Sequence, residues 1–184
     1  MTTTWRFTNL LAIAGAAWAT MPAHAQLTRN LAPYVASPQE IIDVMLESAA
    51  VKQGDRVFDL GCGDGRIVIT AAKRFGAKAV GVELNPQLAR MASDTIIRLG
   101  LQNHASIVKA NMFDVDVSSA DVVTLYLLTK SNEMLKPKLE KELRAGARVV
   151  SHDYAVRGWK PIRVEEVTVH DRVHKIYVYE MGKK

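Results

Sequence analysis

The hydrophobic positions of this chain switch repeatedly between two patterns. Short apolar runs bounded by turn residues indicate buried strands, whereas apolar residues spaced three and four apart indicate helices that pack on one face. The first pattern predicts strands at 56–60, 77–83, 105–109, 122–128 and 148–152. The second predicts helices after Pro38, after a glycine loop at 61–65, over 86–99 and over 132–143.

Local signals predict where these helices begin and end. The segment Ser37-Pro38-Gln39-Glu40 has the pattern of a capping box with proline at the first helical position. Gly76 and Gly100 are expected to end the second and third helices, because glycine readily takes the left-handed conformation found there. Pro137 falls inside the fourth predicted helix and is expected to interrupt it.

Two β-rich segments complete the pattern, at 164–169 and 175–180. The little chain between them predicts an antiparallel hairpin that finishes the sheet. Strands that alternate with helices form mostly parallel sheets covered on both faces. The predicted fold class is therefore α/β: a Rossmann-like, seven-stranded, mostly parallel sheet with a C-terminal antiparallel hairpin and helices on both faces.

The first 25 residues differ from the rest of the chain. Arg6 is their only charged side chain, residues 7–21 are mostly apolar, and Ala23-His24-Ala25 places small residues where a signal peptidase cleaves. This order predicts a secretory signal that is removed before residue 26, leaving 26–184 as one domain. The apolar run is shorter than the roughly 20 residues of a spanning helix. An uncleaved membrane anchor through residues 7–21 and a disordered or targeting leader remain alternatives.

Composition and charge exclude several classes of protein. Of the 184 residues, 48% are hydrophobic and 23% are charged, which excludes disordered and fibrous architectures. The lone cysteine, Cys62, excludes an intrachain disulfide and a cysteine-rich metal site. A net charge of +5 is too small to indicate nucleic-acid binding, so no nucleic-acid partner is predicted.

The main chemical signal is a glycine loop, Asp59-Leu60-Gly61-Cys62-Gly63-Asp64-Gly65, between a predicted strand and a predicted helix. Open α/β sheets bind ligands at this end of a strand, and glycines let the backbone approach them closely. A dinucleotide site would need a third glycine where the chain has Arg66, and Asp59 and Asp64 would repel a pyrophosphate. The same carboxylates suit S-adenosylmethionine (SAM), which carries a sulfonium and an ammonium group. The loop therefore favours SAM over a dinucleotide, and over a turn without a ligand.

Glu83 ends the second predicted strand. A carboxylate at that position can accept hydrogen bonds from both hydroxyls of a ribose. The alternative is a surface acid that interacts favourably with the start of the next helix. The glycine loop on the preceding strand favours the ribose role.

Several segments together carry a resemblance to a known family. The glycine loop and Gly81-Val82-Glu83-Leu84-Asn85-Pro86 resemble motif I and post-motif I of class I SAM-dependent methyltransferases. The segments that narrow the resemblance are Tyr34-Val35-Ala36-Ser37-Pro38, Val123-Thr124-Leu125-Tyr126-Leu127-Leu128, Leu135-Lys136-Pro137-Lys138-Leu139 and Arg148-Val149-Val150-Ser151-His152. With them the chain resembles the small archaeal protein-lysine N-methyltransferases, and the mitochondrial enzymes that methylate the ATP synthase c-subunit and the adenine nucleotide translocase. The resemblance covers about residues 34–161.

The resemblance implies roles for particular residues. Tyr34 and Ser37 would lie over the methionine end of SAM, and Tyr126 would lie near the transferring methyl group as the catalytic residue. The amino-acid part of SAM would be held by residues of the glycine loop, namely Asp59, Gly61 and Gly63.

Asn111 would lie near the adenine. The family often has aspartate where this chain has Asn111, although an amide oxygen can still accept a hydrogen bond from the adenine amino group. A turn residue after a strand is the alternative explanation of Asn111.

Methyl transfer to an amine requires mainly alignment and desolvation, because SAM itself supplies the leaving group. A lysine ammonium loses its proton more readily in an apolar channel, since burial lowers its pKa. The apolar residues Val123, Leu125, Tyr126, Leu127 and Leu128 would line such a channel. No dedicated general base is evident, and a fully buried parallel strand is the alternative explanation of this run.

Three further features receive less weight. Ser151-His152-Asp153 has the residue types of a hydrolase triad, but adjacent strand residues point to opposite faces and cannot form a relay. His170 and His174 flank a turn with no further ligand evident, so no metal site is predicted. The segment Lys130 to Arg148 carries six basic and three acidic residues, which indicates a solvated helix face that could also steer an acidic partner.

The sequence thus predicts a SAM-dependent methyltransferase that modifies lysine side chains of a protein, with substrate choice in the loop 111–121 and the helix containing Pro137. A small-molecule methyltransferase and an exported domain without turnover remain alternatives. The predicted leader implies export or a periplasmic location, whereas SAM is made in the cytosol. An uncleaved anchor that keeps the domain in the cytosol would remove this conflict.

Overall fold

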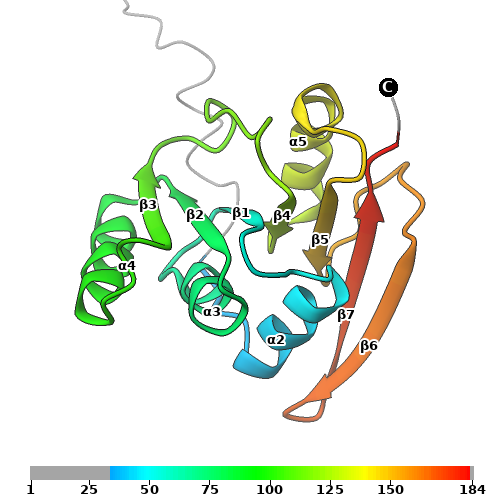
Figure 1. Ribbon diagram of the computed structural model, residues 1–184. Coiled ribbons are helices and arrows are strands. Elements are labelled where there is room, and N and C mark those ends of the chain that lie inside the picture. The colour runs from blue at the N-terminus through cyan, green and yellow to red at the C-terminus, as the bar shows by residue number, and fades with distance from the viewer. Residues whose placement is uncertain (1–33, 183–184) are drawn as a thin grey trace, which may run out of the picture.

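The computed structural model describes residues 34–182, so the predicted leader at 1–25 lies outside the described residues. The strands are β1 (Arg56–Leu60), β2 (Lys78–Glu83), β3 (Ala105–Lys109), β4 (Val122–Leu125), β5 (Arg148–His152), β6 (Arg163–Val169) and β7 (Arg172–Glu180). The helices are α2 (Gln39–Ser48), α3 (Arg66–Phe75), α4 (Pro86–Arg98) and α5 (Thr129–Glu142) (Figure 1). None of the helices in this range combines the length and apolar content that a membrane crossing requires.

The seven strands form one sheet in the order β3-β2-β1-β4-β5-β7-β6. The first five strands are parallel, and β7 runs antiparallel to both β5 and β6. This confirms the predicted fold class. The strand order reverses between β1 and β4, which is the switch point where open α/β sheets bind ligands.

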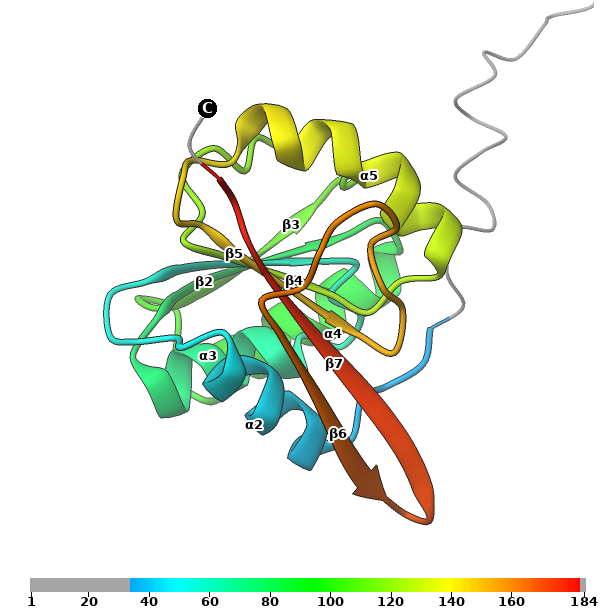
Figure 2. The same ribbon diagram turned by 90° about the vertical axis from the view of Figure 1, so that its right-hand side faces the viewer.

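Helices cover both faces of the sheet, with α2, α3 and α4 on one side and α5 on the other (Figure 2). Because side chains alternate along a strand, β1 contributes Val57 to the core under α2 and α3, and Phe58 and Leu60 to the core under α5. The sheet is packed between these two cores, and the loops that follow the carboxyl ends of its strands lie outside them.

The structure differs from the sequence prediction around β4 and α5. The strand predicted over 122–128 ends at Leu125, and α5 begins at Thr129 rather than at residue 132. Pro137 lies within one continuous helix, so the predicted interruption is wrong. Leu135 and Leu139 on either side of it are fully buried, and this packing outweighs the local cost of the proline.

The predicted capping box at Ser37 is also wrong. Helix α2 begins at Gln39, with Pro38 at its N-cap and no side-chain hydrogen bond to the cap. The Ser37 hydroxyl is instead buried, 3.0 Å from Nδ1 of His152 at the far end of the sequence. A tertiary contact has therefore replaced the local one.

The terminal hairpin is longer than predicted. Strands β6 and β7 are joined by the two residues His170 and Asp171, whose φ angles of 47° and 61° are both in the left-handed region. Such a two-residue turn fits the right-handed twist of the strands, and it lets the pairing begin directly at Val169 and Arg172.

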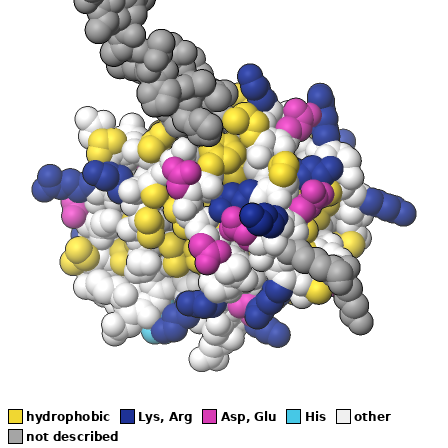
Figure 3. Space-filling model, turned by 90° about the horizontal axis from the view of Figure 1, so that it is seen from above, with side chains coloured by type: hydrophobic (Ala, Val, Ile, Leu, Met, Phe, Trp, Pro, Cys, Tyr) yellow, Lys and Arg dark blue, Asp and Glu magenta, His cyan; other side chains and the backbone are white. Residues whose placement is uncertain are grey.

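Charges on the surface are mixed. Seen from above, Lys and Arg side chains are spread around the face with Asp and Glu side chains between them (Figure 3). On α5, Lys136 lies 3.8 Å from Glu140 and Lys138 lies 2.6 Å from Glu142, each pair one helical turn apart. The excess of basic residues between Lys130 and Arg148 is thus partly balanced on the helix itself.

Candidate active site

A cavity of about 300 Å³ opens at the carboxyl ends of β1, β2 and β4. The residues predicted to bind the cofactor or to act in catalysis all line it: Tyr34, Ser37, Asp59, Gly61, Gly63, Asp64, Glu83, Asn111 and Tyr126. These residues lie far apart in the sequence, and the parallel sheet brings them together because it places its strand ends along one edge.

The glycine loop forms one wall of the cavity. The amides of Gly61 and Cys62 both donate to the carbonyl of Val82, at 2.8 and 3.0 Å, which ties the loop to β2. Gly63 has a φ of 55°, and a Cβ there would lie 2.7 Å from Cε2 of Tyr34. Glycine is therefore needed at this position for the tyrosine ring to lie against the loop.

Asp59 is the most unusual residue of the site. It is 2% exposed, and its Oδ1 accepts a 2.7 Å hydrogen bond from the Thr124 hydroxyl. Among the described residues, no group hydrogen-bonds its Oδ2. Burial, and to a smaller extent the nearby charges of Glu83 and Asp64, raise the pKa of this carboxyl to about 7, against the lowering effect of Thr124. An unpaired, buried carboxylate oxygen is costly, and a cationic ligand would relieve that cost.

Glu83 is oriented by the backbone around it. Its Oε2 accepts from the amide of Gly63 at 2.9 Å, and its Oε1 accepts from the amide of Asn85 at 2.7 Å. Each carboxylate oxygen can accept more than one hydrogen bond, so both can still receive a ligand's hydroxyl groups. The Asn85 side chain caps α4 by accepting from Gln87 and Leu88, which fixes the turn after Glu83.

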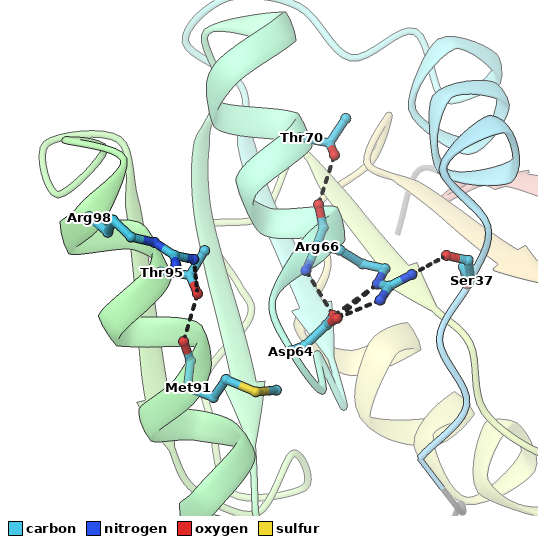
Figure 4. A network of polar contacts seen from close by, with 7 residues as sticks. All are labelled: Ser37, Asp64, Arg66, Thr70, Met91, Thr95 and Arg98. Atoms are coloured by element: carbon cyan, nitrogen blue, oxygen red, sulfur yellow. Dashed lines mark hydrogen bonds and ion pairs between the residues drawn. The ribbon is translucent and has the colours of Figure 1, made fainter.

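Asp64 is paired within the protein. The Arg66 guanidinium donates to both of its carboxylate oxygens and also to the carbonyl of Ser37 at 2.8 Å (Figure 4). Burial opposes ionisation of Asp64, but Arg66 more than offsets it and holds the pKa of that carboxyl below its usual value. Arg66 thereby connects the segment before α2 to the glycine loop, a role that was not predicted from the sequence.

His152 is a second residue that the sequence analysis missed. It is fully buried at the end of β5, 3.0 Å from the Ser37 hydroxyl, and the Tyr126 ring stacks on it with a centroid separation of 3.9 Å. Burial lowers the pKa of His152 to about 4, so the ring is neutral at physiological pH. It therefore supports two cavity residues without lining the cavity itself.

The structure also tests the reasoning about the Ser151-His152-Asp153 segment. The Ser151 hydroxyl donates to the carbonyl of Tyr154 at 2.6 Å, away from His152, as the alternation of strand residues predicts. That reasoning fails for Asp153, which has a φ of 59° just after the strand and turns back to lie 3.5 Å from Nε2 of His152.

The apolar run at the end of β4 divides between core and cavity. Val123 and Leu125 are fully buried in the core on the α5 side, so the fully buried strand explains them. Tyr126 and Leu127 line the cavity, and Leu128 is 38% exposed. The predicted channel is therefore limited to the residues after the strand.

The turn role of Asn111 is present in the structure, and its place near the adenine stays a prediction. Its side-chain oxygen accepts from the amide of Phe113 at 3.2 Å, which is the turn role. The same side chain lines the cavity, and its amide can still donate or accept there.

Comparison with known proteins identifies the family. Residues 59–163 match the family described as the ANTKMT methyltransferase domain. The chain is 55% identical over 152 residues to a protein-lysine N-methyltransferase of Saccharolobus islandicus, covering 82% of this chain and 94% of that protein. It is 30% identical over 149 residues to the adenine nucleotide translocase lysine N-methyltransferase of Mus musculus, covering 81% of this chain and 63% of that protein.

A solved structure is also that of a methyltransferase. An RNA methyltransferase of Salinibacter ruber, in complex with S-adenosyl-L-homocysteine, superimposes with a TM-score of 0.76 at 38% identity, over 82% of this chain and 95% of that one. Together, the Rossmann-like sheet, the glycine loop and these similarities define a SAM-dependent methyltransferase. The chain belongs to the ANTKMT methyltransferase domain family, which confirms the resemblance predicted from its motifs.

Proposed function

We propose that the cavity binds SAM in a defined orientation and transfers its methyl group to the side chain of a lysine in a protein. The observation that carries the orientation is Asp59, a buried carboxylate with one unpaired oxygen beside the glycine loop. The ammonium group of SAM supplies the donor and the positive charge that this oxygen lacks. Gly61 and Gly63 leave room for the amino-acid part to approach the backbone.

Glu83 indicates where the ribose and adenine of the cofactor would lie. Its two oxygens, held by the amides of Gly63 and Asn85, would accept the ribose hydroxyls, and Asn111 lies one strand further on for the adenine. Asp64 contributes to this site by holding Arg66 in place rather than by contact with a cation.

The methyl group would then lie near Tyr34, Ser37 and Tyr126. Burial, with a further contribution from Asp153, raises the pKa of Tyr126, so its hydroxyl stays protonated and can orient a neutral amine. The step itself needs the amine nitrogen, the methyl carbon and the sulfur in line, which positioning alone can favour by about 7–11 kcal/mol in the best cases. The substrate ammonium first loses its proton to solvent water, helped by the apolar surroundings of Leu127 and Tyr126, which lower its pKa. The neutral nitrogen then forms a bond to the methyl carbon as the carbon–sulfur bond breaks, and S-adenosylhomocysteine leaves.

A protein substrate is favoured by the rim of the cavity. Tyr34, Val35 and Leu84 line it and are each about half exposed, which gives an apolar surface for a polypeptide. An RNA substrate, suggested by the name of the Salinibacter ruber protein, would need unpaired basic side chains there. Arg66, the basic residue of the cavity wall, is instead committed to Asp64.

Two experiments test this function. Isothermal titration with SAM and with S-adenosylhomocysteine should show binding at one site per chain; failure of both to bind would refute the cofactor assignment. Radiolabelled SAM and the purified protein should then be incubated with an extract of the source cells. The labelled products are divided into three portions, which are treated with protease, with ribonuclease or by acid hydrolysis. Label recovered as methyllysine supports the proposal, whereas label lost only to ribonuclease or found only in small molecules refutes the protein substrate.

We also propose that residues 1–25 are a cleaved secretory signal and that 26–184 form the mature domain, which places the enzyme outside the cytosol. The charged, apolar and small-residue order of the leader supports this. The dependence on SAM, a cytosolic metabolite, favours the alternative of an uncleaved anchor through residues 7–21. N-terminal sequencing of the native protein separates them: a chain that starts at Gln26 supports cleavage, and a chain that keeps residues 7–21 overturns it.

A further inference from the structure

Three side chains meet where β5 ends beside β7, just behind the cavity wall. Nε2 of His152 lies 2.9 Å from Nδ1 of His174, and Oδ2 of Asp153 lies 3.2 Å from His174 Nδ1 and 3.5 Å from His152 Nε2. Both histidines are buried, at 0% and 4% exposed. We call these three residues the His-Asp-His cluster. In the sheet His152 is paired with Ile176, two residues from His174, and the Asp153 amide donates to the carbonyl of Lys175 at 2.7 Å, so these contacts hold the end of β5 beside β7.

The buried nitrogen and oxygen atoms of this cluster all have hydrogen-bond partners, but one hydrogen has to serve two of the contacts. An imidazole nitrogen has one position in the ring plane, which holds either a hydrogen or a lone pair. His174 Nδ1 faces both His152 Nε2 and the Asp153 carboxylate, so the two contacts have to share one hydrogen. If His174 instead accepts from His152, its lone pair faces the carboxylate, which is a repulsive arrangement in a buried place.

The same geometry suits a metal ion. A point about 1 Å outside the plane of the three atoms is about 2.1 Å from all of them, which is the bond length of zinc to imidazole nitrogen and carboxylate oxygen. The three separations are close to those between ligands of a tetrahedral ion of this size. Two imidazoles and one carboxylate are also a donor set that favours divalent transition metals over calcium or magnesium.

The surroundings orient each proposed ligand. His152 can present a lone pair at Nε2 only if its hydrogen is on Nδ1, and the Ser37 oxygen lies 3.0 Å from Nδ1 to accept it. Asp153 is held by the amide of Lys175 at Oδ1 and by Arg172 at Oδ2, 2.8 Å away. The Arg172 guanidinium is a positive charge next to the cluster, and its side chain is 60% exposed, so it is free to move away from an incoming cation.

We propose that His152, Asp153 and His174 form a binding site for one divalent transition-metal ion, with Zn²⁺ as the ion that fits best and water in the fourth position. None of these three residues lines the cofactor cavity, so the ion would act as a structural brace rather than as a Lewis acid for methyl transfer. It would hold β5 against β7 and fix the position of His152. The Ser37 hydroxyl contacts this ring, and the Tyr126 ring stacks on it. The site was not predicted from the sequence, which considered His174 only with His170.

Metal binding can be measured without any assumption about substrate or cofactor. The full chain, stripped with a chelator and dialysed, should bind one Zn²⁺ per chain in isothermal titration, and should give the visible absorption of tetrahedral Co²⁺ when cobalt is used instead. Asp153→Asn, which keeps the shape of the side chain, and His174→Ala should each weaken Zn²⁺ binding at least 100-fold.

Arg172→Gln is the matched control, because it changes a neighbour of the cluster but no proposed ligand. Removal of its positive charge should leave Zn²⁺ affinity unchanged or increase it. No stoichiometric binding by the folded wild-type chain would overturn the proposal, and so would equal affinity in the wild type, Asp153→Asn and His174→Ala. Titration of S-adenosylhomocysteine into the same samples keeps this result separate from the cofactor assignment, since that binding tests only the cavity. Circular dichroism shows whether each variant is folded.

Discussion

At the scale of single residues, Asp59 places function and stability in conflict. Its raised pKa of about 7, against 3.8 for a free aspartate, means that the folded chain binds more protons than the unfolded chain between pH 4 and 7. Stability therefore falls as pH rises through this window, by up to about 4 kcal/mol above pH 7. The protein keeps a buried charge that disfavours its own folding.

Asp59→Asn should expose this conflict. Without ligand, the variant should be more stable than the wild type by a few kcal/mol at pH 8 and equally stable at pH 4, where Asp59 is protonated. Its affinity for S-adenosylhomocysteine should fall by roughly 10- to 100-fold, which corresponds to one charge-assisted hydrogen bond. Urea unfolding at the two pH values and isothermal titration measure both effects. A variant that is less stable at pH 8 and binds normally would contradict this account.

Gly81 shows a different constraint, one of space. A Cβ at this position would lie 2.6 Å from Sγ of Cys62 and 2.7 Å from Cδ1 of Ile107, below the glycine loop. Gly81→Ala should therefore destabilise the fold by about 1–3 kcal/mol through overpacking, as measured by urea unfolding. The double variant Gly81→Ala/Cys62→Ala should recover part of the loss, because it removes the closest atom. Equal stability of the single and double variants would show that Cys62 is not the obstacle.

Some residues of the site could be predicted from their neighbours in the sequence, and others could not. Asp59, Gly63 and Glu83 could be predicted, since each falls at a strand end or in a glycine loop whose chemistry shows in a few neighbouring letters. The contacts that Arg66 and His152 make with Ser37 could not be assigned, because Ser37 is 29 positions from Arg66 and 115 positions from His152. A buried histidine has no periodicity of its own, and only the folded sheet shows which hydroxyl and which ring it meets.

At the scale of secondary structure, the positions of elements were easier to predict than their ends. The strands β1, β3 and β5 have the predicted bounds because turn residues limit them on both sides. The apolar run after β4 continues beyond the strand because Tyr126 and Leu127 line the cavity. Hydrophobicity at a site therefore looks the same as hydrophobicity in a core when only the sequence is known.

The β6–β7 hairpin offers a test at this scale. Its turn residues His170 and Asp171 both have positive φ angles. Asn-Gly is the sequence that two-residue hairpin turns of this kind favour, because glycine adopts a positive φ without steric strain. His170→Asn/Asp171→Gly should raise the free energy of unfolding by roughly 1 kcal/mol, observed as a higher melting temperature. Neither residue lines the cavity, so binding of S-adenosylhomocysteine should not change. A lower melting temperature would mean that the turn has another role.

At the scale of the whole molecule, the position of the cavity matters more than any single contact. It lies where the strand order reverses, and its walls come from β1 and β2 on one side and from the segment after β4 on the other. Those walls adjoin both hydrophobic cores, one on each face of the sheet. A ligand in the cavity therefore joins parts of the molecule that would otherwise be connected only through the sheet.

This arrangement predicts that cofactor binding stabilises the entire domain and not only a loop. At a concentration 100 times its dissociation constant, S-adenosylhomocysteine should add about 2.7 kcal/mol to the free energy of unfolding. For a domain of this size that corresponds to a rise of about 5–10 °C in melting temperature. Far-ultraviolet circular dichroism reports the whole sheet, while fluorescence of Trp159, the one tryptophan of residues 26–184, reports the region on the α5 side where it lies against Tyr179. Both signals should shift together, because the cores unfold as one unit. If the ligand shifted the dichroism signal and left the Trp159 transition where it was, the two faces of the sheet would have to unfold independently.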